Sequence, residues 1–110
     1  MKLREGDEMK LRHVVLFGFK TTVGEAEIGE VVRRFVALRT EVPGIEGFER
    51  GVNNSPEGLN RGLTHAFTLT FANAADRDAY LIHPTHRAFS RWVGEFIEAV
   101  TVIDYWAEAV

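Results

Sequence analysis

The sequence contains no cysteine and no long hydrophobic run, and each absence excludes a class of protein. Without cysteine the chain forms no disulfide and has no thiolate to act as a nucleophile or metal ligand. No stretch approaches the ~18 apolar residues of a membrane span, and the first residues are charged where a signal peptide would be apolar. These features predict a cytoplasmic protein with no membrane partner.

The sequence also lacks a large excess of positive or negative charge. The 13 basic and 16 acidic residues give a net charge of -3 and are interspersed along the chain. A nucleic-acid-binding protein would instead carry a basic cluster, so we expect no nucleic acid partner. The glycines form no phosphate-binding pattern, so we expect no nucleotide and no other cofactor. The histidines have no established metal-ligand spacing, so we expect no transition metal. Weak Mg²⁺ binding stays open.

A chain of 110 residues with 45% hydrophobic and 26% charged residues has the composition of one globular domain. Residues 1–8 are mostly charged and lack periodicity, and the four residues from Met9 repeat the four from Met1. Either methionine can therefore be the start of translation. We interpret residues 1–8 as a leader outside the fold and 9–110 as a single domain.

Hydrophobic periodicity predicts four strands and three helical segments. Thr22 and Glu25 resemble a capping box at the start of the first helix, Pro43 and Gly44 end it, and Asn53 to Gly58 has turn composition. The predicted strands are 12–19, 45–52, 63–71 and 97–106, and the predicted helices are 23–41, 73–81 and 84–93.

The element order βαββαβ predicts an α+β, ferredoxin-like fold, in which right-handed crossovers place the helices on one face of a four-stranded antiparallel sheet. The other face would be apolar or hydroxylated and uncharged, with Val14, Leu16, Ala66, Thr68 and Thr70. Such a face needs a cover. We expect a homodimer in which two copies pack sheet to sheet into an α/β barrel.

The segment from Tyr80 to His86 concentrates groups that exchange protons near neutral pH. It places two of the four histidines and one of the two tyrosines within seven residues. Tyr80 and His86 are six residues apart, so they do not share one face of a helix, and a break at Pro84 has to turn them towards each other. Because His83 precedes a proline, a capping role at a helix start competes with a role in the pocket.

Several short motifs in this order resemble the stress-responsive dimeric α/β-barrel (Dabb) family. The resemblance covers nearly everything after Leu11. The motifs are Arg12-His13-Val14-Val15-Leu16-Phe17, Val42-Pro43-Gly44-Ile45, Gly51 with Asn53 and Ser55, Thr64-His65-Ala66-Phe67, Tyr80 with His83-Pro84-Thr85-His86, and Ile103-Asp104-Tyr105.

The resemblance implies a homodimeric barrel but no definite reaction, because most members of the family have none assigned. By analogy with a plant polyketide cyclase of the family, Tyr80 and His86 would be catalytic, with His86 the base and Tyr80 the donor to a developing oxyanion. The ligand would be a small hydrophobic carbonyl compound. The implied pocket lies between the sheet and the helices, and its predicted lining residues are His13, Val15, Phe17, His65, Phe67 and His83.

Other interpretations of the same residues remain. The histidines could be structural in a non-catalytic dimer that serves stability or stress protection, and a cofactor-free monooxygenase of a related barrel type is a further option. His13 and His65 share parity with the aromatic faces of their strands and should point towards the helices. Both lie near the start of a strand, however, and antiparallel pairing tends to place such residues at opposite ends of a sheet.

Overall fold

The computed structural model describes residues 9–110, so the expected leader at residues 1–8 lies outside the described part of the chain. The elements follow the predicted βαββαβ order, with the second helical segment divided in two. They are β1 (Leu11–Phe19), α1 (Glu25–Glu41), β2 (Ile45–Val52), β3 (His65–Phe71), α2 (Ala74–Ile82), α3 (Pro84–Val93) and β4 (Ile97–Trp106).

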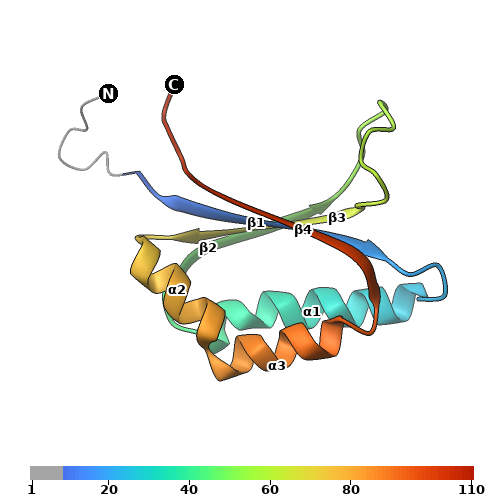
Figure 1. Ribbon diagram of the computed structural model, residues 1–110, viewed down its shortest axis with the longest axis horizontal. Helices are drawn as coiled ribbons and strands as arrows, with labels where there is room; N and C mark the ends of the chain where they lie inside the picture. The colour runs from blue at the N-terminus through green and yellow to red at the C-terminus, as the bar shows by residue number, and fades with distance from the viewer. Residues whose placement is uncertain (1–8) are drawn as a thin grey trace.

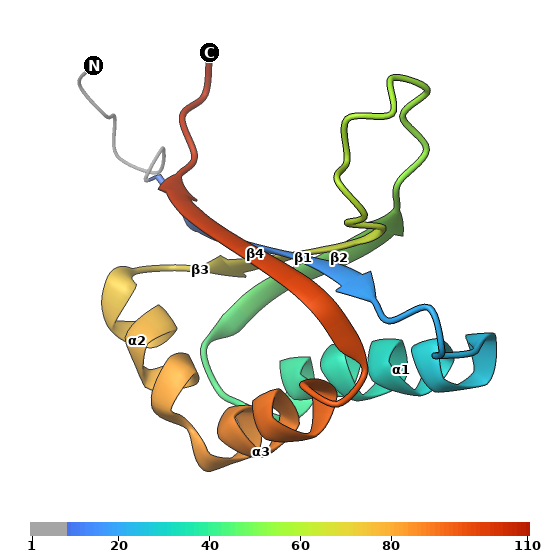
Figure 2. The same cartoon turned by 45° about the vertical axis from the view of Figure 1, so that its right-hand side comes forward.

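The four strands form one antiparallel sheet in the order β2-β3-β1-β4. Figure 1 shows α1, α2 and α3 together on one face of this sheet, and Figure 2 shows the same two layers after a turn of the molecule. The predicted ferredoxin-like fold is therefore confirmed. β1 and β3 lie in the centre, and β2 and β4 form the edges.

The predicted start of the first helix was wrong. The helix begins at Glu25 rather than Val23, and Gly24, not Thr22, is its N-cap residue. A turn closed by the Val23 N–H and the Lys20 carbonyl keeps the earlier residues out of the helix. The side chain of Glu27 accepts a hydrogen bond from the Gly24 N–H at 3.0 Å, so the capping carboxylate lies two residues further along than predicted.

The third strand also starts later than predicted, at His65 rather than Leu63. Leu63 and Asn60 bond to each other instead: the Leu63 N–H donates to the Asn60 carbonyl at 2.9 Å, and the Asn60 amide donates to the Leu63 carbonyl at 3.0 Å. Arg61 and Gly62 have φ values of 51° and 78°, which strand geometry excludes. The β2–β3 loop therefore extends from residue 53 to residue 64.

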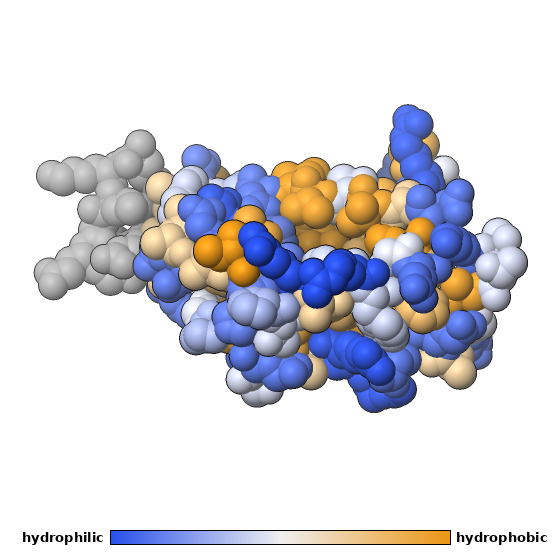
Figure 3. Space-filling model, turned by 60° about the horizontal axis from the view of Figure 1, so that its bottom comes forward, coloured by the Kyte–Doolittle hydropathy of each residue, from blue (hydrophilic) through white to orange (hydrophobic). Residues whose placement is uncertain are grey.

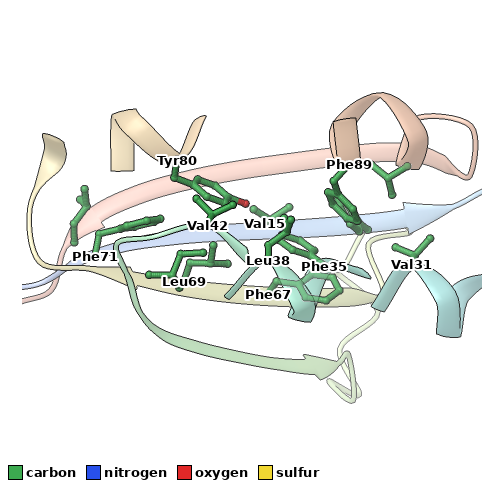
Figure 4. Packing of buried hydrophobic residues seen from close by; sticks show 14 residues of the cluster. Val15, Val31, Phe35, Leu38, Val42, Phe67, Leu69, Phe71, Tyr80 and Phe89 are labelled. Atoms are coloured by element: carbon green, nitrogen blue, oxygen red, sulfur yellow. The ribbon is translucent and has the colours of Figure 1, made fainter. Parts of the chain in front are cut away.

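An aromatic core fills the space between the sheet and the helices. The Phe35 ring of α1 lies 4.4 Å from the Phe67 ring and 4.9 Å from the Phe89 ring, which joins β3, α1 and α3. Figure 4 shows these side chains between the two layers, with Tyr80 reaching in from α2. Truncating a buried phenylalanine such as Phe35 to alanine typically lowers the free energy of unfolding by about 3–5 kcal/mol.

The opposite face of the sheet is partly exposed and has no helix over it (Figure 1). Its centre is apolar or hydroxylated as predicted, but the face is not uncharged. Arg12 lies on it and donates a hydrogen bond to the Thr70 hydroxyl at 3.1 Å. We call this surface the free face and define it by Val14, Leu16, Ala66, Thr68 and Thr70, with Ile103 and Tyr105 on the edge strand.

The helical side of the protein has a mixed surface. With this side turned forward, hydrophilic residues cover much of the surface and hydrophobic residues gather in patches between them (Figure 3). Within residues 9–110, no helix combines the length and the apolar character that crossing a membrane requires.

Candidate functional site

The break between α2 and α3 brings Tyr80 and His86 together. His83 ends α2 and caps α3, because its Nδ1 accepts the Thr85 N–H at 3.1 Å and its own N–H donates to the Tyr80 carbonyl at 3.1 Å. Pro84 is the first residue of α3. The resulting corner places the Tyr80 and His86 rings 4.3 Å apart between their centroids.

These two rings lie in the wall of a cavity of about 480 Å³, which we call the Tyr80 cavity. Apolar side chains form most of its lining, and all three helices and two strands contribute. The lining residues are His13, Val15, Phe17, Phe35, Tyr80, Leu81, His86, Phe89, Ser90, Val93, Ile97, Val100, Val102 and Asp104. This combination of apolar walls and a few polar groups is typical of a small-molecule site.

Tyr80 presents a hydroxyl without a protein partner. The residue is 1% exposed, and its hydroxyl makes no hydrogen bond within residues 9–110. Figure 4 shows this oxygen directed towards the middle of the core rather than towards solvent. Burial raises the pKa of Tyr80 well above its usual value, so the hydroxyl stays protonated and can donate a hydrogen bond.

His86 has one ring nitrogen fixed as a donor and the other as an acceptor. Its Nδ1 lies 3.1 Å from the Leu81 carbonyl oxygen, which can only accept, so the proton is on Nδ1. Nε2 therefore has the lone pair, and the Ser90 hydroxyl donates to it at 3.3 Å. Desolvation is the main cause that lowers the pKa of His86, which favours the neutral, basic form of the ring.

His13 reaches the same cavity from β1. It is 4% exposed, and its ring packs edge-on against Tyr80 at 5.9 Å between centroids. Its Nδ1 lies 2.8 Å from Oδ1 of Asp104, the residue directly opposite on β4. Nη1 of Arg77 donates to the other oxygen of Asp104, also at 2.8 Å.

Asp104, Arg77 and Ser90 belong to this arrangement and were not among the predicted site residues. A signal for Asp104 was present, because it has the same parity on β4 as Val100 and Val102, which also line the cavity. An acidic residue at an inward position of an otherwise apolar strand indicates a buried partner. No comparable pattern marked Arg77 or Ser90.

Three of the predicted lining residues lie elsewhere. Phe67 is buried in the core against Phe35 and does not border the Tyr80 cavity. His83 caps α3 through its Nδ1. His65 pairs with Phe17, four residues along β1 from His13, so the two histidines are at opposite ends of the sheet.

His65 lines a different cavity, of about 420 Å³, beneath the β2–β3 loop. We call it the loop cavity; its other lining residues include Asn53, Asn54, Ser55, Asn60 and Arg61. Nδ1 of His65 and the Thr64 hydroxyl are hydrogen-bonded at 2.8 Å, and the ring packs edge-on against Phe19 at 5.1 Å. Desolvation and, to a smaller extent, the charge of Arg50 lower the pKa of His65.

In the described part of the chain, no three acidic, cysteine or histidine residues are grouped so that they could hold a metal ion. The polar groups that line the Tyr80 cavity are the hydroxyls of Tyr80 and Ser90, the imidazoles of His13 and His86, and the carboxylate of Asp104. Such groups suit proton transfer at a carbonyl compound.

Comparison with known proteins gives a consistent result. The model of the stress responsive A/B barrel domain family, Dabb, matches residues 11–107. A stress-response A/B barrel domain-containing protein of Arabidopsis thaliana is 32% identical over 95 residues, which are 86% of this chain and 87% of that protein. Olivetolic acid cyclase of Cannabis sativa is 27% identical over 97 residues, covering 88% and 96% of the two chains.

Solved structures agree with the fold. A crystal structure of an Arabidopsis thaliana protein superimposes with a TM-score of 0.87 at 31% identity, covering 91% of this chain and 97% of the other. A dimeric protein of unknown function with a ferredoxin-like fold from Bacteroides fragilis gives a TM-score of 0.70 at 27% identity, covering 89% and 96%.

Proposed function

The chain belongs to the stress responsive A/B barrel domain family, and from this premise we propose that it binds a small apolar carbonyl compound in the Tyr80 cavity and removes a proton beside the carbonyl group. One observation carries the proposal. The buried Tyr80 hydroxyl has no partner within residues 9–110, and the Tyr80 ring lies against the ring of His86, whose neutral form is favoured.

The proposed chemistry uses the two groups in different roles. The Ser90 hydroxyl first turns away from Nε2 of His86, which then takes a proton from the carbon next to the carbonyl. The electron pair of the broken C–H bond forms the C=C bond of the enolate, and the π pair of the carbonyl group moves to its oxygen. The Tyr80 hydroxyl donates a hydrogen bond to that developing enolate oxygen. Attack of the enolate carbon on a second carbonyl carbon would form a C–C bond, as in an aldol cyclisation, and the resulting alkoxide would take the proton that His86 holds. The name of olivetolic acid cyclase supports a ring-forming reaction.

The apolar walls of the cavity serve the same chemistry. Val15, Phe17 and Phe35 exclude water from the side of the cavity opposite the helix corner. Tyr80 itself is buried, and away from bulk water a hydrogen bond from its hydroxyl stabilises an enolate more strongly than it would in water. A ligand that is mostly hydrocarbon would also gain free energy from the apolar surface that it covers.

The test uses 4-phenyl-2-butanone, an apolar ketone, as the probe. We expect it to shift the NMR resonances of Tyr80 and His86, and we expect the protein to accelerate deuterium exchange at the carbons beside its carbonyl group. Tyr80→Phe and His86→Ala should abolish the acceleration, while His65→Ala, which changes a histidine of the loop cavity, serves as the matched control. A probe that neither binds in the cavity nor exchanges faster than in buffer would contradict the proposal.

We further propose that the protein is a cytoplasmic homodimer whose free faces pack against each other. Support comes from the uncovered apolar centre of the free face and from the dimeric Bacteroides fragilis relative. Sedimentation at micromolar concentration should give about twice the chain mass of 12.4 kDa. Val14→Asp, which puts a carboxylate in the centre of the contact, should shift the protein towards the monomer, and a wild-type protein that sediments as a monomer would contradict the proposal.

A non-catalytic dimer that serves stability or stress protection is the second candidate. It is favoured by the packing of Tyr80, one of the largest fully buried side chains, and by the contact of His13 with Asp104, which links β1 to β4. In this case His86→Ala would lower the melting temperature, and the probe would exchange at its uncatalysed rate in the wild type as well as in every variant. The exchange rate of the wild type therefore separates the two candidates.

A further inference from the structure

The structure contains a chain of three charged or polar residues that the proposed proton transfer does not use. Arg77 of α2, Asp104 of β4 and His13 of β1 are joined by two contacts of 2.8 Å. Each oxygen of the Asp104 carboxylate has its own partner, Oδ1 with His13 and Oδ2 with Arg77. The chain ends at His13, whose ring lies in the wall of the Tyr80 cavity.

These contacts determine which nitrogen of His13 carries the proton. An ionised carboxylate can only accept hydrogen bonds, so the short contact between Asp104 and His13 requires a proton on Nδ1. A neutral His13 ring then has its lone pair on Nε2. Among residues 9–110 no group forms a hydrogen bond to this Nε2, and the residue borders the cavity, so the lone pair is available to a ligand.

We propose that Asp104, held in place by Arg77, fixes the proton of His13 on Nδ1 and thereby keeps Nε2 as a hydrogen-bond acceptor for a hydroxyl group of the ligand. This inference rests on the proposed function, because it concerns the same cavity. The cavity then offers a donor, the Tyr80 hydroxyl, and an acceptor, Nε2 of His13, on neighbouring rings. The complementary ligand is an apolar compound that has both a carbonyl oxygen and a hydroxyl group.

Arg77 makes the role of Asp104 testable by a single substitution. In Asp104→Asn the side chain keeps its shape but has one oxygen and one NH₂ group. Because the Arg77 guanidinium can only donate, the amide oxygen has to face Arg77, and the NH₂ group has to face Nδ1 of His13. Nδ1 must then accept, so the proton moves to Nε2 and the cavity loses its acceptor. An aspartate-to-asparagine change beside a catalytic histidine is known to select the wrong tautomer in this way.

The first measurement is the histidine tautomer in the free protein, read from the imidazole ¹⁵N shifts. We expect His13 to carry its proton on Nδ1 in the wild type and on Nε2 in Asp104→Asn. Asp78→Asn is the matched control, because Asp78 is the other carboxylate that Arg77 contacts, at 2.9 Å, and it makes no contact with His13. The double variant Arg77→Met with Asp104→Asn should show both tautomers, because the amide can then turn either its oxygen or its NH₂ group towards Nδ1.

The second measurement compares 4-hydroxy-4-phenyl-2-butanone with its 4-methoxy analogue, which has no hydroxyl proton to donate. The wild type and Asp78→Asn should bind the hydroxy compound at least about tenfold more tightly, because the methoxy group leaves Nε2 unpaired. In Asp104→Asn the Nε2–H can donate to either oxygen, and the ratio of the two dissociation constants should fall towards one. The extra methyl group of the methoxy compound affects binding equally in the wild type and the variants. A change in the ratio of the two dissociation constants therefore reports the hydrogen-bond acceptor alone.

Each outcome decides a defined part of the inference. A wild-type His13 with its proton on Nε2 or on both nitrogens would overturn it, even if Asp104→Asn failed to fold. An unchanged tautomer in Asp104→Asn, or a switched tautomer with an unchanged preference for the hydroxy compound, would overturn it as well. If neither ketone binds the wild type, the proposed function fails and so does the ligand assigned to His13, whereas the tautomer still reports whether Asp104 positions the ring.

Discussion

The Tyr80 cavity and the loop cavity are similar in size, about 480 and 420 Å³, and each contains a histidine from the helix-facing side of the same sheet. They differ in what surrounds that histidine. His13 lies among side chains from five regular elements, whereas most residues around His65 belong to the β2–β3 loop. Strand residues complete the loop cavity, among them Leu16 and Ala66 of the free face. Four positions of β1, or about 13 Å of strand, separate the two sites.

The two cavities differ more in the hydrogen bonds of their polar groups than in the residue types that line them. In the loop cavity the polar groups bond locally: His65 with Thr64, the Ser55 N–H with the Asn53 side chain, and Asn60 with Leu63. In the Tyr80 cavity the Tyr80 hydroxyl is left without a partner among the described residues. A buried polar group without a partner lowers stability unless a ligand pairs with it, so this difference indicates which cavity is built to bind.

The largest expected effect tests this comparison directly with one histidine from each cavity. His86→Ala should slow deuterium exchange of 4-phenyl-2-butanone by about 10²-fold or more, because it removes the proton acceptor. His65→Ala should leave the exchange rate within about threefold of the wild type, since its ring lies in the loop cavity. NMR measures both rates. Equal losses in the two variants would show that the cavities are not functionally distinct.

The next largest expected effect is on the free energy of unfolding. Removing a hydroxyl should raise this free energy at the Tyr80 cavity and lower it at the loop cavity. Tyr80→Phe removes an unpartnered buried hydroxyl, so it should raise the free energy of unfolding by about 1 kcal/mol. Thr64→Val removes a hydroxyl that is paired with His65 and should lower it by about 1 kcal/mol. Urea denaturation measures both values. A destabilised Tyr80→Phe would mean that the hydroxyl has a partner in solution, such as a bound water.

The contrast also shows what the sequence could predict. Strand parity placed His13 and His65 on the helix-facing side of the sheet, and the position of Pro84 predicted the corner that turns Tyr80 towards His86. Local patterns could not predict the contact of His13 with Asp104, because it joins residues 91 positions apart through the β1–β4 register. The predicted start of α1 was wrong for a different reason, because a local turn between Lys20 and Val23 competed with the apparent capping box.

A smaller effect is expected in the pH dependence of stability. The pKa of both His86 and His65 is lowered by folding, so between the unfolded value of about 6.5 and the folded value the unfolded chain binds more protons. The free energy of unfolding should therefore fall as the pH decreases below about 6.5. His86→Ala and His65→Ala should each flatten this decrease when urea denaturation is repeated from pH 7.5 to 5, and a variant that steepens it would contradict the assigned direction.

The smallest effect separates the causes of the two pKa shifts. Desolvation is the largest cause at both histidines. The charge of Arg50 is the second cause of the lowered pKa of His65, whereas the charges of His13 and His83 are the smallest causes at His86. Salt screens the charge of Arg50 on the partly exposed loop side. Raising the ionic strength from about 0.02 to 0.5 M should therefore move the pKa of His65 back towards its usual value, and that of His86 by less. NMR titration of the ring protons measures both shifts in one sample. Arg50→Gln should remove the salt dependence at His65 alone, and a His86 that responds to salt as strongly as His65 would show that charge, rather than burial, governs the ring beside Tyr80.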